Sequence, residues 1–347
     1  MERLWYSGGW PFRLMAAALL PAAGLYRLAL RLRPKEAVSP LPVISVGNLT
    51  LGGNGKTTLV IDLALRLKRR GVRVAVVLRG YGRVDHRPLE FDSASVPPAR
   101  LAGDEPVLLA RRLPGVKVLV DADRRRAARR ALDELGAEVV LADDAFQHQR
   151  LGRALDIVAI NARRGFGNGR LFPAGPLREP LSALRRAHML VFTYAESEQD
   201  PECLRQRFSL PPGVPIAVCS MQPEGFVTGP ELMPAPPPQA GVVAFCGVGD
   251  APGFFSSCRA AGLALLAQVA FPDHHFFTNR DLESIGQLCR RFGTVALCSE
   301  KDLVRIERKV DFPLLALRSR VLWADEKRLE DILDEFATDW IRTVALP

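Results

Sequence analysis

The stretch that decides the fold is V-I-S-V-G-N-L-T-L-G-G-N-G-K-T-T-L-V, from Val43 to Val60. Its β-branched start, Val43–Val46, predicts a strand, and an amphipathic helix is expected from Lys56 to about Arg70. A strand, a glycine-rich loop and a helix that begins at Lys-Thr are typical of phosphate-binding loops. Glycines let backbone N–H groups approach phosphate oxygens, and the helix N-terminus adds partial positive charge. The stretch therefore predicts a nucleotide site formed by Thr50, Leu51, Gly52, Gly53, Asn54, Gly55, Lys56 and Thr57.

The cofactors expected at this loop are ATP and Mg²⁺. Lys56 would reach the β- and γ-phosphates, and the Thr57 hydroxyl would hold Mg²⁺. The usual pattern has glycine at position 50, where this chain has Thr50, and the extra glycines Gly52 and Gly53 lie inside the loop. A flexible turn without a ligand is the alternative interpretation. The joint presence of strand, loop, Gly-Lys-Thr and helix favours nucleotide binding.

Composition limits the class of protein and its compartment. The 347 residues are 48% hydrophobic, enough to bury a substantial core, and allow two domains of ordinary size. The net charge of +9 suggests an anionic partner, namely a nucleotide, a nucleic acid or an acidic membrane surface. All 6 cysteines follow position 200 without a C-x-x-C pair, which fits neither a disulfide framework nor a zinc site. A reduced, cytosolic setting is expected for the main body.

Residues 1–35 differ from the rest of the chain. Aromatic residues precede an apolar run, Leu14–Leu30, which Pro21 and Gly24 interrupt. The run is marginal in length for a bilayer span and lacks an obvious cleavage site. An amphipathic helix lying in an anionic membrane surface fits better, with a helix packed on its own domain as the alternative. The aromatic and basic groups of this segment are Trp5, Tyr6, Trp10, Phe12, Arg27, Arg31, Arg33 and Lys35.

Apolar runs alternate with amphipathic stretches from residue 72 to 160, which predicts a doubly wound parallel α/β sheet. A proline-rich segment, Pro230–Pro238, is expected to be a linker or an edge connection before a smaller α/β domain. We therefore expect a membrane-associating helix at 1–35, a phosphate-loop domain at 36–228 and a smaller domain at 229–347. The expected strands are Val72–Leu78, Val116–Val120, Val139–Leu141, Asp156–Ile160, Val242–Phe245, Ala267–Phe271, Val295–Cys298 and Leu314–Leu317, and the expected helices are Glu105–Leu113 and Arg124–Leu135.

Functional groups should lie at the carboxyl ends of the parallel strands. Asp143 and Asp144 follow an apolar strand, an arrangement suited to Mg²⁺ or its waters. The segment Phe166–Glu179 has too many glycines and prolines for a regular element and is expected to be a structured functional loop. A carboxylate at Asp104 could also cap the helix that follows it. The arginines at 124–126 and 129–130 are expected to form a solvated helix face.

With these residues in view, the chain resembles the tetraacyldisaccharide 4'-kinase family, the lipid A 4'-kinases of Gram-negative bacteria. The matching motifs occur in the family's order between about residues 40 and 305, and the ordered set is far more specific than any one of them. They are G-N-L-T-L-G-G-N-G-K-T (47–57), R-G-Y-G (79–82), G-D-E-P (103–106), D-D-A-F-Q-H (143–148), F-G-N-G (166–169), P-A-G-P-L-R-E (173–179), G-V-G (247–249), D-H (273–274) and E-K-D (300–302).

The resemblance implies a P-loop kinase that transfers the ATP γ-phosphate to the 4'-hydroxyl of an acylated glucosamine disaccharide 1-phosphate, giving lipid IV-A. It implies attachment to the cytoplasmic face of the inner membrane and a smaller C-terminal domain that closes over the site. It also suggests Asp104 as the base that takes the hydroxyl proton, paired with His274, and Lys56 as a further catalytic residue that stabilises charge on the transferring phosphoryl group. Substrate contacts are expected from Arg79, Tyr81, Glu105, Gln147, His148, Asn168 and Arg178.

Two other classes of protein share single features with this chain. A regulatory P-loop ATPase of the partitioning type has lysine just before the two loop glycines, where this chain has Leu51. A GTPase would need an Asn-Lys-x-Asp motif, and no asparagine in this sequence is followed by lysine. A nucleic-acid-binding module would suit the positive charge, but aromatic residues are only 7% of the chain and are not interleaved with the basic runs. No nucleic-acid partner is therefore expected.

Overall fold

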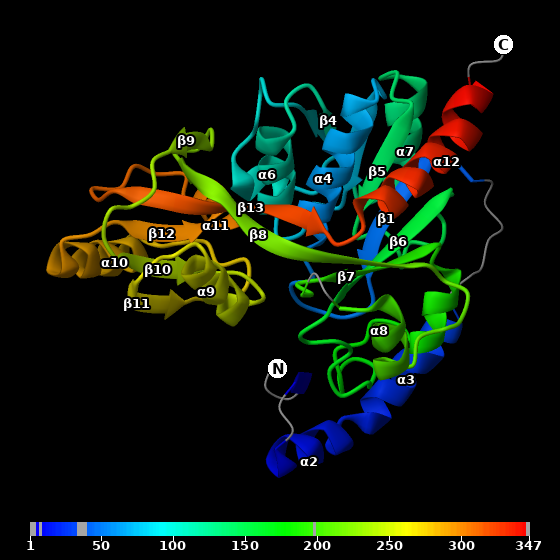
Figure 1. The fold of residues 1–347 in the computed structure, drawn as a ribbon, viewed down its shortest axis with the longest axis horizontal. Helices are drawn as coiled ribbons and strands as arrows, with labels where there is room; N and C mark the ends of the chain where they lie inside the picture. The colour runs from blue at the N-terminus through cyan, green and yellow to red at the C-terminus, as the bar shows by residue number, and fades with distance from the viewer. Residues whose placement is uncertain (1–4, 7–8, 33–39, 197–198, 345–347) are drawn as a thin grey trace. The chain divides into compact units, whose positions relative to one another are not determined.

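The structure, a computed structural model, describes residues 5–6, 9–32, 40–196 and 199–344 (Figure 1). The chain divides into two compact units, each built from separate segments. The first unit comprises Met1–Leu59, Glu138–Ser220 and Leu322–Pro347, and the second comprises Val60–Ala137 and Met221–Val321. This division does not follow the sequential domains expected from the sequence, and the boundaries at 35/36 and 228/229 stay a prediction.

The first unit is built on a parallel sheet in the order β8-β7-β6-β1-β5. Strand β1 lies between β5 and β6, with Val43 opposite Val140 and Ile44 opposite Leu155. Every residue of β1, β5, β6 and β7 is buried, as expected for central strands of a parallel sheet covered on both faces. The strands are β1 (Val43–Asn48), β5 (Val139–Asp143), β6 (Leu155–Asn161), β7 (Met189–Thr193) and the first part of β8 (Ile216–Thr228).

The helices of the first unit include an amino-terminal pair, α2 and α3, with a 50° bend between them. Neither helix of this pair is long and apolar enough to cross a membrane by itself, and only the bent pair together has a sufficient length and apolar composition. A core of apolar side chains, Phe146 and Phe192 among them, lies beside β6 and β7. The helices are α2 (Trp10–Ala18), α3 (Leu20–Arg31), the 3₁₀ helix η1 (Leu181–Arg186), α8 (Pro201–Arg207), α12 (Glu326–Val344) and the first turn of α4 (Lys56–Arg69).

The second unit contains two groups of strands. In one, β2 and β4 are parallel and β3 is antiparallel to β4. In the other, the order is β11-β10-β12-β13-β8, and β9 pairs with β8 antiparallel. The strands are β2 (Val74–Leu78), β3 (Leu89–Phe91), β4 (Lys117–Val120), the second part of β8, β9 (Met233–Ala235), β10 (Val242–Cys246), β11 (Leu265–Ala270), β12 (Ala296–Ser299) and β13 (Leu314–Trp323).

Several helices of the second unit begin at residues whose side chains cap them. Thr278 and Ser299 each form a reciprocal capping box, with Asp281 and Asp302 respectively. Asp123 accepts from two backbone N–H groups at the start of α7. The helices are α5 (Ala99–Ala102), α6 (Asp104–Arg112), α7 (Arg124–Asp133), α9 (Ala251–Ala260), α10 (Asn279–Phe292), α11 (Glu300–Arg305) and the rest of α4.

The predicted α/β class with a mainly parallel sheet is confirmed. Each expected strand is present, as are the helices expected from residues 56, 105 and 124, with bounds within two residues of the predicted ones except at β13, which extends to Trp323. The proline-rich segment 230–238 contains β9, so the edge-connection interpretation is the correct one. The expected helix at 1–35 is two helices instead, because the chain bends between Ala18 and Leu20. Residues 1–4, 7–8 and 33–35 of that prediction lie outside the described residues.

Candidate functional site

The predicted phosphate loop begins where β1 ends, in the first unit. A Cβ atom at Gly47 would lie 2.4 Å from the Cβ of Phe146, so only glycine fits at this close approach. Gly52 and Gly55 have φ of 106° and 71°, which L side chains rarely adopt. Thr50 does not have a positive φ, and a side chain is therefore tolerated where the usual pattern has glycine.

The loop is held by its own side chains and by the end of β7. The amide of Asn54 donates to Thr50 Oγ1 at 3.1 Å and to the carbonyl of Gly52 at 3.1 Å. The hydroxyl of Thr193, the last residue of β7, donates to the carbonyl of Asn54 at 3.1 Å. These bonds join the two halves of the loop, so the backbone is shaped before any ligand arrives.

Lys56 lies in a small network of charges. Its Nζ donates to Asn48 Oδ1 at 2.9 Å and forms an ion pair with Asp144 Oδ1 at 3.0 Å. Arg178 Nη1 donates to both carboxylate oxygens of Asp144, at 2.9 and 2.8 Å. Gln147 Nε2 donates to the carbonyl of Asn48 at 2.8 Å. The structure therefore brings together four residues that the sequence predicted for the site, with Asn48 as an additional member.

Asp144 has an unusual backbone and a perturbed carboxyl group. Its φ of 52° lies in the left-handed region, and its N–H donates to the carbonyl of Val46 at 2.8 Å. Burial alone would raise the pKa of this carboxyl, but the charges of Lys56 and Arg178 outweigh burial and hold the pKa well below its usual range. Asp144 is therefore ionised at neutral pH.

The glycine-rich segment 166–179 pairs with the phosphate loop. Leu51 N–H donates to the carbonyl of Pro176 at 2.9 Å, and Arg178 N–H donates to the carbonyl of Leu49 at 2.8 Å. Apart from isolated bridges such as Thr50–Leu177, this segment has no regular element, as the sequence predicted. The pairing places Arg178 beside Asp144.

The amino-terminal residues contact the same segment. Tyr26 of α3 donates its hydroxyl proton to the carbonyl of Arg178 at 2.9 Å, and Trp5 Nε1 donates to the carbonyl of Pro173 at 3.1 Å. The ring of Phe172 lies edge-to-face with both Trp5 and Tyr26, with ring centroids 6.3 and 5.9 Å apart. The packed-helix alternative therefore describes part of this region, because these aromatic residues pack on their own unit.

The residues predicted to hold Mg²⁺ lie at adjoining strand and helix ends. Asp143 is the last residue of β5 and is opposite Val46 of β1, while Thr57 is the second residue of α4. Carboxylate and hydroxyl oxygens are the ligands that Mg²⁺ prefers, so this donor set fits the ion. Among the described residues, no group of three or more His, Cys, Asp or Glu side chains is arranged to hold a metal without other donors.

Asp104 and His274 meet in the second unit. His274 Nδ1 lies 3.0 Å from Asp104 Oδ2, although 170 residues separate them in the sequence. Asp104 is the first residue of α6, whose N-cap is Gly103, so the helix-cap interpretation of Asp104 is wrong. The other oxygen, Oδ1, accepts from the backbone N–H of Glu105 at 2.9 Å. The side chain of Asp104 is 4% exposed and that of His274 is 26% exposed, so the imidazole is the accessible partner.

The contact between Asp104 and His274 changes the pKa of both side chains. Burial alone would raise the pKa of Asp104, but the His274 hydrogen bond and the charge of Arg305 outweigh it and lower the pKa well below its usual range. Burial lowers the pKa of His274, yet the hydrogen bond and charge of Asp104 dominate, and that pKa is raised. At neutral pH Asp104 is therefore an anion, and His274 binds a proton more tightly than a free imidazole.

Three predicted substrate residues lie in the same unit as this pair, and two of them, Tyr81 and Glu105, are next to it. The ring of Tyr81 lies 5.2 Å from the ring of His274, and Tyr81 is 70% exposed. Glu105 Oε1 forms an ion pair of 2.6 Å with Lys301 of the E-K-D motif. Arg79 follows β2 and is exposed. Tyr81 and Arg79 are accessible to an incoming ligand, while Glu105 has a protein partner.

Two other predicted substrate residues lie in the first unit and make contacts there. Asn168 donates to the carbonyl of Ala174 at 2.8 Å and accepts from Arg170 N–H at 3.1 Å, so its amide clamps the glycine-rich segment. The carbonyl of His148 accepts from Arg153 at 2.7 Å. A substrate role for Asn168 or His148 stays a prediction.

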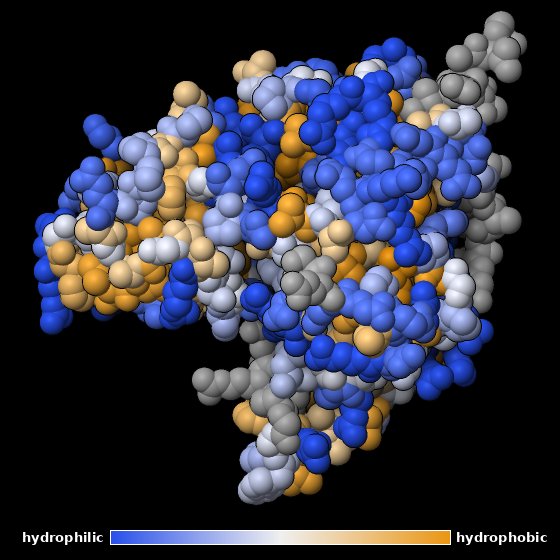
Figure 2. Space-filling model, viewed as in Figure 1, coloured by the Kyte–Doolittle hydropathy of each residue, from blue (hydrophilic) through white to orange (hydrophobic). Residues whose placement is uncertain are grey.

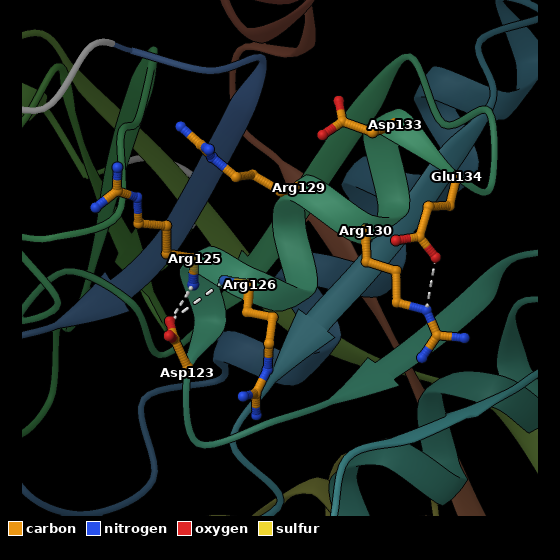
Figure 3. Close-up of a pocket in the computed structure, with 7 residues that line it drawn as sticks. All are labelled: Asp123, Arg125, Arg126, Arg129, Arg130, Asp133 and Glu134. Carbon is orange, nitrogen blue, oxygen red and sulfur yellow. Dashed lines mark hydrogen bonds and ion pairs between the residues drawn. The ribbon is translucent and has the colours of Figure 1, made fainter.

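A shallow hollow on α7 contains no predicted site residue. Its lining is Asp123, Arg125, Arg126, Arg129, Arg130, Asp133 and Glu134 (Figure 3). Acidic neighbours pair with two of the arginines, since Arg126 lies 2.8 Å from Asp121 and Arg130 lies 3.3 Å from Glu134. The prediction of a solvated face is correct for Arg126, Arg129 and Arg130 and wrong for Arg124, which is buried.

Sequence reasoning missed two residues that bind the predicted ones. Asn48 holds Lys56, and its position at the end of β1 was the available signal. Arg305 forms an ion pair with Asp104 at 2.9 Å, and nothing in its local sequence indicated a partner 201 positions away.

A parallel sheet, a loop shaped by glycines after its first strand, and a lysine at the start of the next helix define the class of P-loop nucleotide-binding proteins. Within that class the chain belongs to the tetraacyldisaccharide-1-P 4'-kinase family, whose model matches residues 15–338.

Two curated relatives, both named tetraacyldisaccharide 4'-kinase, match nearly the full chain. The protein of Gluconacetobacter diazotrophicus is 37% identical over 339 residues and covers 96% of each chain. That of Anaeromyxobacter sp. strain K is 38% identical over 340 residues, which cover 92% of this chain and 89% of the relative. A crystal structure described as the "apo" form of LpxK from Aquifex aeolicus in complex with ATP superposes with a TM-score of 0.74 at 31% identity, covering 93% of this chain and 99% of that one.

Proposed function

We propose that this protein transfers the γ-phosphate of ATP to the 4'-hydroxyl of a tetraacylated glucosamine disaccharide 1-phosphate, a step of lipid A biosynthesis. The family match and the names of the relatives support this substrate class. The contact between His274 Nδ1 and Asp104 Oδ2 carries the proposal, because a sugar hydroxyl must lose its proton as the new P–O bond forms. A phosphate loop without such a pair would suit a regulatory ATPase equally well.

In the proposed reaction the 4'-oxygen attacks the γ-phosphorus, the bond to the bridging oxygen breaks, and ADP leaves. Asp104 accepts the hydroxyl proton, and His274 orients its carboxylate. A carboxyl with a lowered pKa is a weak base, but phosphoryl transfer passes through a loose transition state that needs little proton removal until late. Asp104 is also ionised over the whole neutral range, so it is always available as an acceptor.

Charge on the transferring group would be stabilised by Lys56, which Asn48 already holds beside the loop. Mg²⁺, held by Thr57 with Asp143 or Asp144, would neutralise charge on the phosphate oxygens when bound. Arg178 is placed beside Asp144 and is accessible enough to contact an anionic substrate as well.

We also propose that α2 and α3 lie on the anionic cytoplasmic face of the inner membrane of a Gram-negative bacterium. Large apolar side chains on these helices are exposed, and apolar residues are visible at the surface around them in Figure 2. A short helix with such a face binds an interface through apolar burial and basic residues. The exposed apolar residues are Trp10, Leu14, Met15, Leu20, Leu25, Leu28 and Leu32.

The proposed activity is tested by incubating the purified protein with ATP, Mg²⁺ and tetraacyldisaccharide 1-phosphate. The expected product is the acceptor with one added phosphate at the 4'-position, located by mass spectrometry and NMR. ATP hydrolysis that does not depend on the acylated disaccharide would contradict the proposal and favour a regulatory ATPase. Stimulation of hydrolysis by RNA or DNA would favour the nucleic-acid-binding alternative.

A further inference from the structure

Arg305 is the buried cation nearest to the proposed proton acceptor. It is the last residue of α11 and is 4% exposed, and its side chain makes contacts with two other parts of the second unit. A buried guanidinium is unfavourable unless its charge is compensated, so its neighbours indicate why it is there.

The first neighbour is Asp104. Arg305 Nε lies 2.9 Å from Asp104 Oδ2, the same oxygen that contacts His274 Nδ1 at 3.0 Å. The two charged side chains are 1% and 4% exposed. The geometry at Nε does not satisfy a hydrogen bond, so the contact is an ion pair. Asp104 Oδ2 is therefore held from two sides, by an imidazole and by a guanidinium.

The second neighbour is the turn that carries His274. Arg305 Nη1 donates to the carbonyl of Gly247 at 2.9 Å and to the carbonyl of His275 at 3.1 Å. The carbonyl of Gly247 also accepts the backbone N–H of His274 at 3.1 Å. His274 has φ of 58°, a conformation that persists in a non-glycine residue only when the surroundings enforce it. Arg305 supplies part of that enforcement.

Arg305 is itself held in place by the E-K-D motif. Asp302 Oδ1 lies 3.4 Å from Arg305 Nη1 and accepts the N–H of Gly247 at 2.9 Å. The other carboxylate oxygen of Asp302 belongs to the capping box with Ser299. The guanidinium is thus fixed by α11 before it contacts the dyad.

We infer that Arg305 is a positioning residue for the proposed reaction, with one guanidinium that fixes both the carboxylate of Asp104 and the turn that presents His274. The inference rests on the proposed function, in which Asp104 and His274 handle the proton of the acceptor hydroxyl. Arg305 itself touches neither the acceptor nor the nucleotide in this role.

The same contact gives Arg305 an electrostatic effect. The groups that face Asp104 are His274, Arg305 and Lys301, and Lys301 is shared with Glu105. Burial by itself favours the protonated carboxylic acid, which cannot accept a proton, and the neighbouring cations reverse this preference. Removing the guanidinium should therefore raise the pKa of Asp104, because burial would then be opposed by fewer charges.

The test compares Arg305→Gln and Arg305→Lys with the wild type in the full-length protein, with kcat, KM for ATP and KM for the disaccharide measured from pH 5 to 9. For Arg305→Gln we expect kcat to fall by about 10- to 100-fold, the scale of a misplaced catalytic group. The wild-type kcat profile should show no acid limb down to pH 5, because the pKa of Asp104 lies far below that value, whereas Arg305→Gln should develop an acid limb within this range as burial raises the pKa of Asp104. KM for ATP should stay within about twofold, since Arg305 is not part of the phosphate loop.

Arg112→Gln is the matched control. Arg112 is an arginine of the second unit whose side chain is only 9% exposed. It is paired with Glu300 at 2.6 Å and Glu224 at 3.1 Å, and it has no contact with Asp104 or His274 among the residues and contacts described. The Arg112→Gln variant should have the same kcat profile in acid as the wild type, even if its melting temperature changes. The same acid limb in Arg112→Gln and Arg305→Gln would reduce Arg305 to a purely structural role.

Two further results keep the inference separate from the proposed function. If the wild type shows no disaccharide-dependent phosphorylation, or Asp104→Asn is fully active, the proposed function fails. If both behave as proposed but Arg305→Gln keeps the wild-type kcat and pH profile, only the inference on Arg305 fails. Should Arg305→Gln not fold, Arg305→Lys decides, because one ammonium cannot reach Asp104 and both carbonyls. A folded Arg305→Lys protein with unchanged kcat and pH profile would overturn the inference.

Discussion

Lys56 is the residue on which nucleotide chemistry depends most directly, because its ammonium lies between Asn48 and Asp144 at the loop. We predict that Lys56→Ala lowers kcat by about 100-fold or more, since it removes a charge that acts in the transition state. Circular dichroism should show an intact fold. The control is Lys68→Ala, an exposed lysine of the same helix, which should be neutral. Near-normal kinase activity of Lys56→Ala would contradict the assignment of this loop as the site that binds the phosphates of ATP.

Asp104 and His274 should act as one unit. We predict that Asp104→Asn, which keeps the shape but loses basicity, lowers kcat by roughly 10² to 10⁴-fold. His274→Ala should have a smaller effect, and the double variant should be little worse than Asp104→Asn alone. KM for ATP should barely change. A kcat for Asp104→Asn within about threefold of wild type would exclude the dyad and direct attention to Asp143 and Asp144 as the base.

Individual residues differ in how far the sequence could predict them. Lys56 and Thr57 were predictable because a local spacing carries their chemistry. Asp104 and His274 could be paired only through the family resemblance, since no local pattern links positions 170 residues apart. The ion pair of Arg305 with Asp104 could not be predicted at all, because it depends on how α11 and α6 pack.

At the scale of elements, the amino-terminal helices have two different faces. Tyr26 binds the segment that carries Arg178, while Leu14, Leu25 and Leu28 are exposed. Deletion of residues 1–35 should release the protein from membranes, more easily in high salt, because each basic residue near an anionic surface contributes on the order of 1 kcal/mol. The deletion also removes Tyr26, so loss of activity in it would have two causes.

A point variant separates these two faces. We predict that Leu14→Ser/Leu25→Ser/Leu28→Ser reduces sedimentation with anionic phospholipid vesicles and leaves the circular dichroism spectrum unchanged, because these side chains are already exposed. Leu322→Ser, at an exposed leucine outside the amino-terminal helices, is the control. Vesicle binding by the triple variant at the wild-type level would mean that the helices only pack against their own unit.

The elements most easily predicted were the buried parallel strands, whose apolar runs are unbroken. Strand β8 (Ile216–Thr228) was not anticipated, because Pro223 and Gly225 interrupt its second half and argue locally against a strand. The extension of β13 to Trp323 was missed because Arg318 and Arg320 are polar, and only pairing within the sheet reveals it. Such misses are expected where pairing with distant segments overrides local propensity.

At the scale of the molecule, the two units are assembled from segments that alternate along the chain. A sequential reading cannot anticipate this, because apolar runs show that strands exist but not which of them pair. The order of the sheet is set by contacts between segments far apart in the sequence. The sequential domain boundaries, which were drawn from composition alone, stay a prediction.

Global stability should depend on pH through the same dyad. The raised pKa of His274 contributes stability that is complete below about pH 6.5, the ordinary histidine value, and is lost as pH rises through the folded-state pKa. The lowered pKa of Asp104 contributes stability at every pH above the ordinary aspartate pKa. This stability is lost only in strong acid, as the pH falls through the folded-state pKa. We predict that the melting-temperature difference between wild type and His274→Ala is larger at pH 6 than at pH 9.

His86→Ala, at an exposed histidine, is the control and should show no such trend. A melting-temperature difference for His274→Ala that is constant from pH 6 to 9 would show that His274 gains no stability from its proton.

The close approach of Gly47 to residue 146 has an evolutionary consequence. A Cβ at position 47 would lie 2.4 Å from the Cβ of Phe146 and 2.9 Å from its backbone nitrogen. No change of the side chain at 146 removes the nitrogen, so a compensating mutation there cannot rescue a lost glycine. Selection must therefore preserve glycine at position 47 by itself, whatever residue stands at 146.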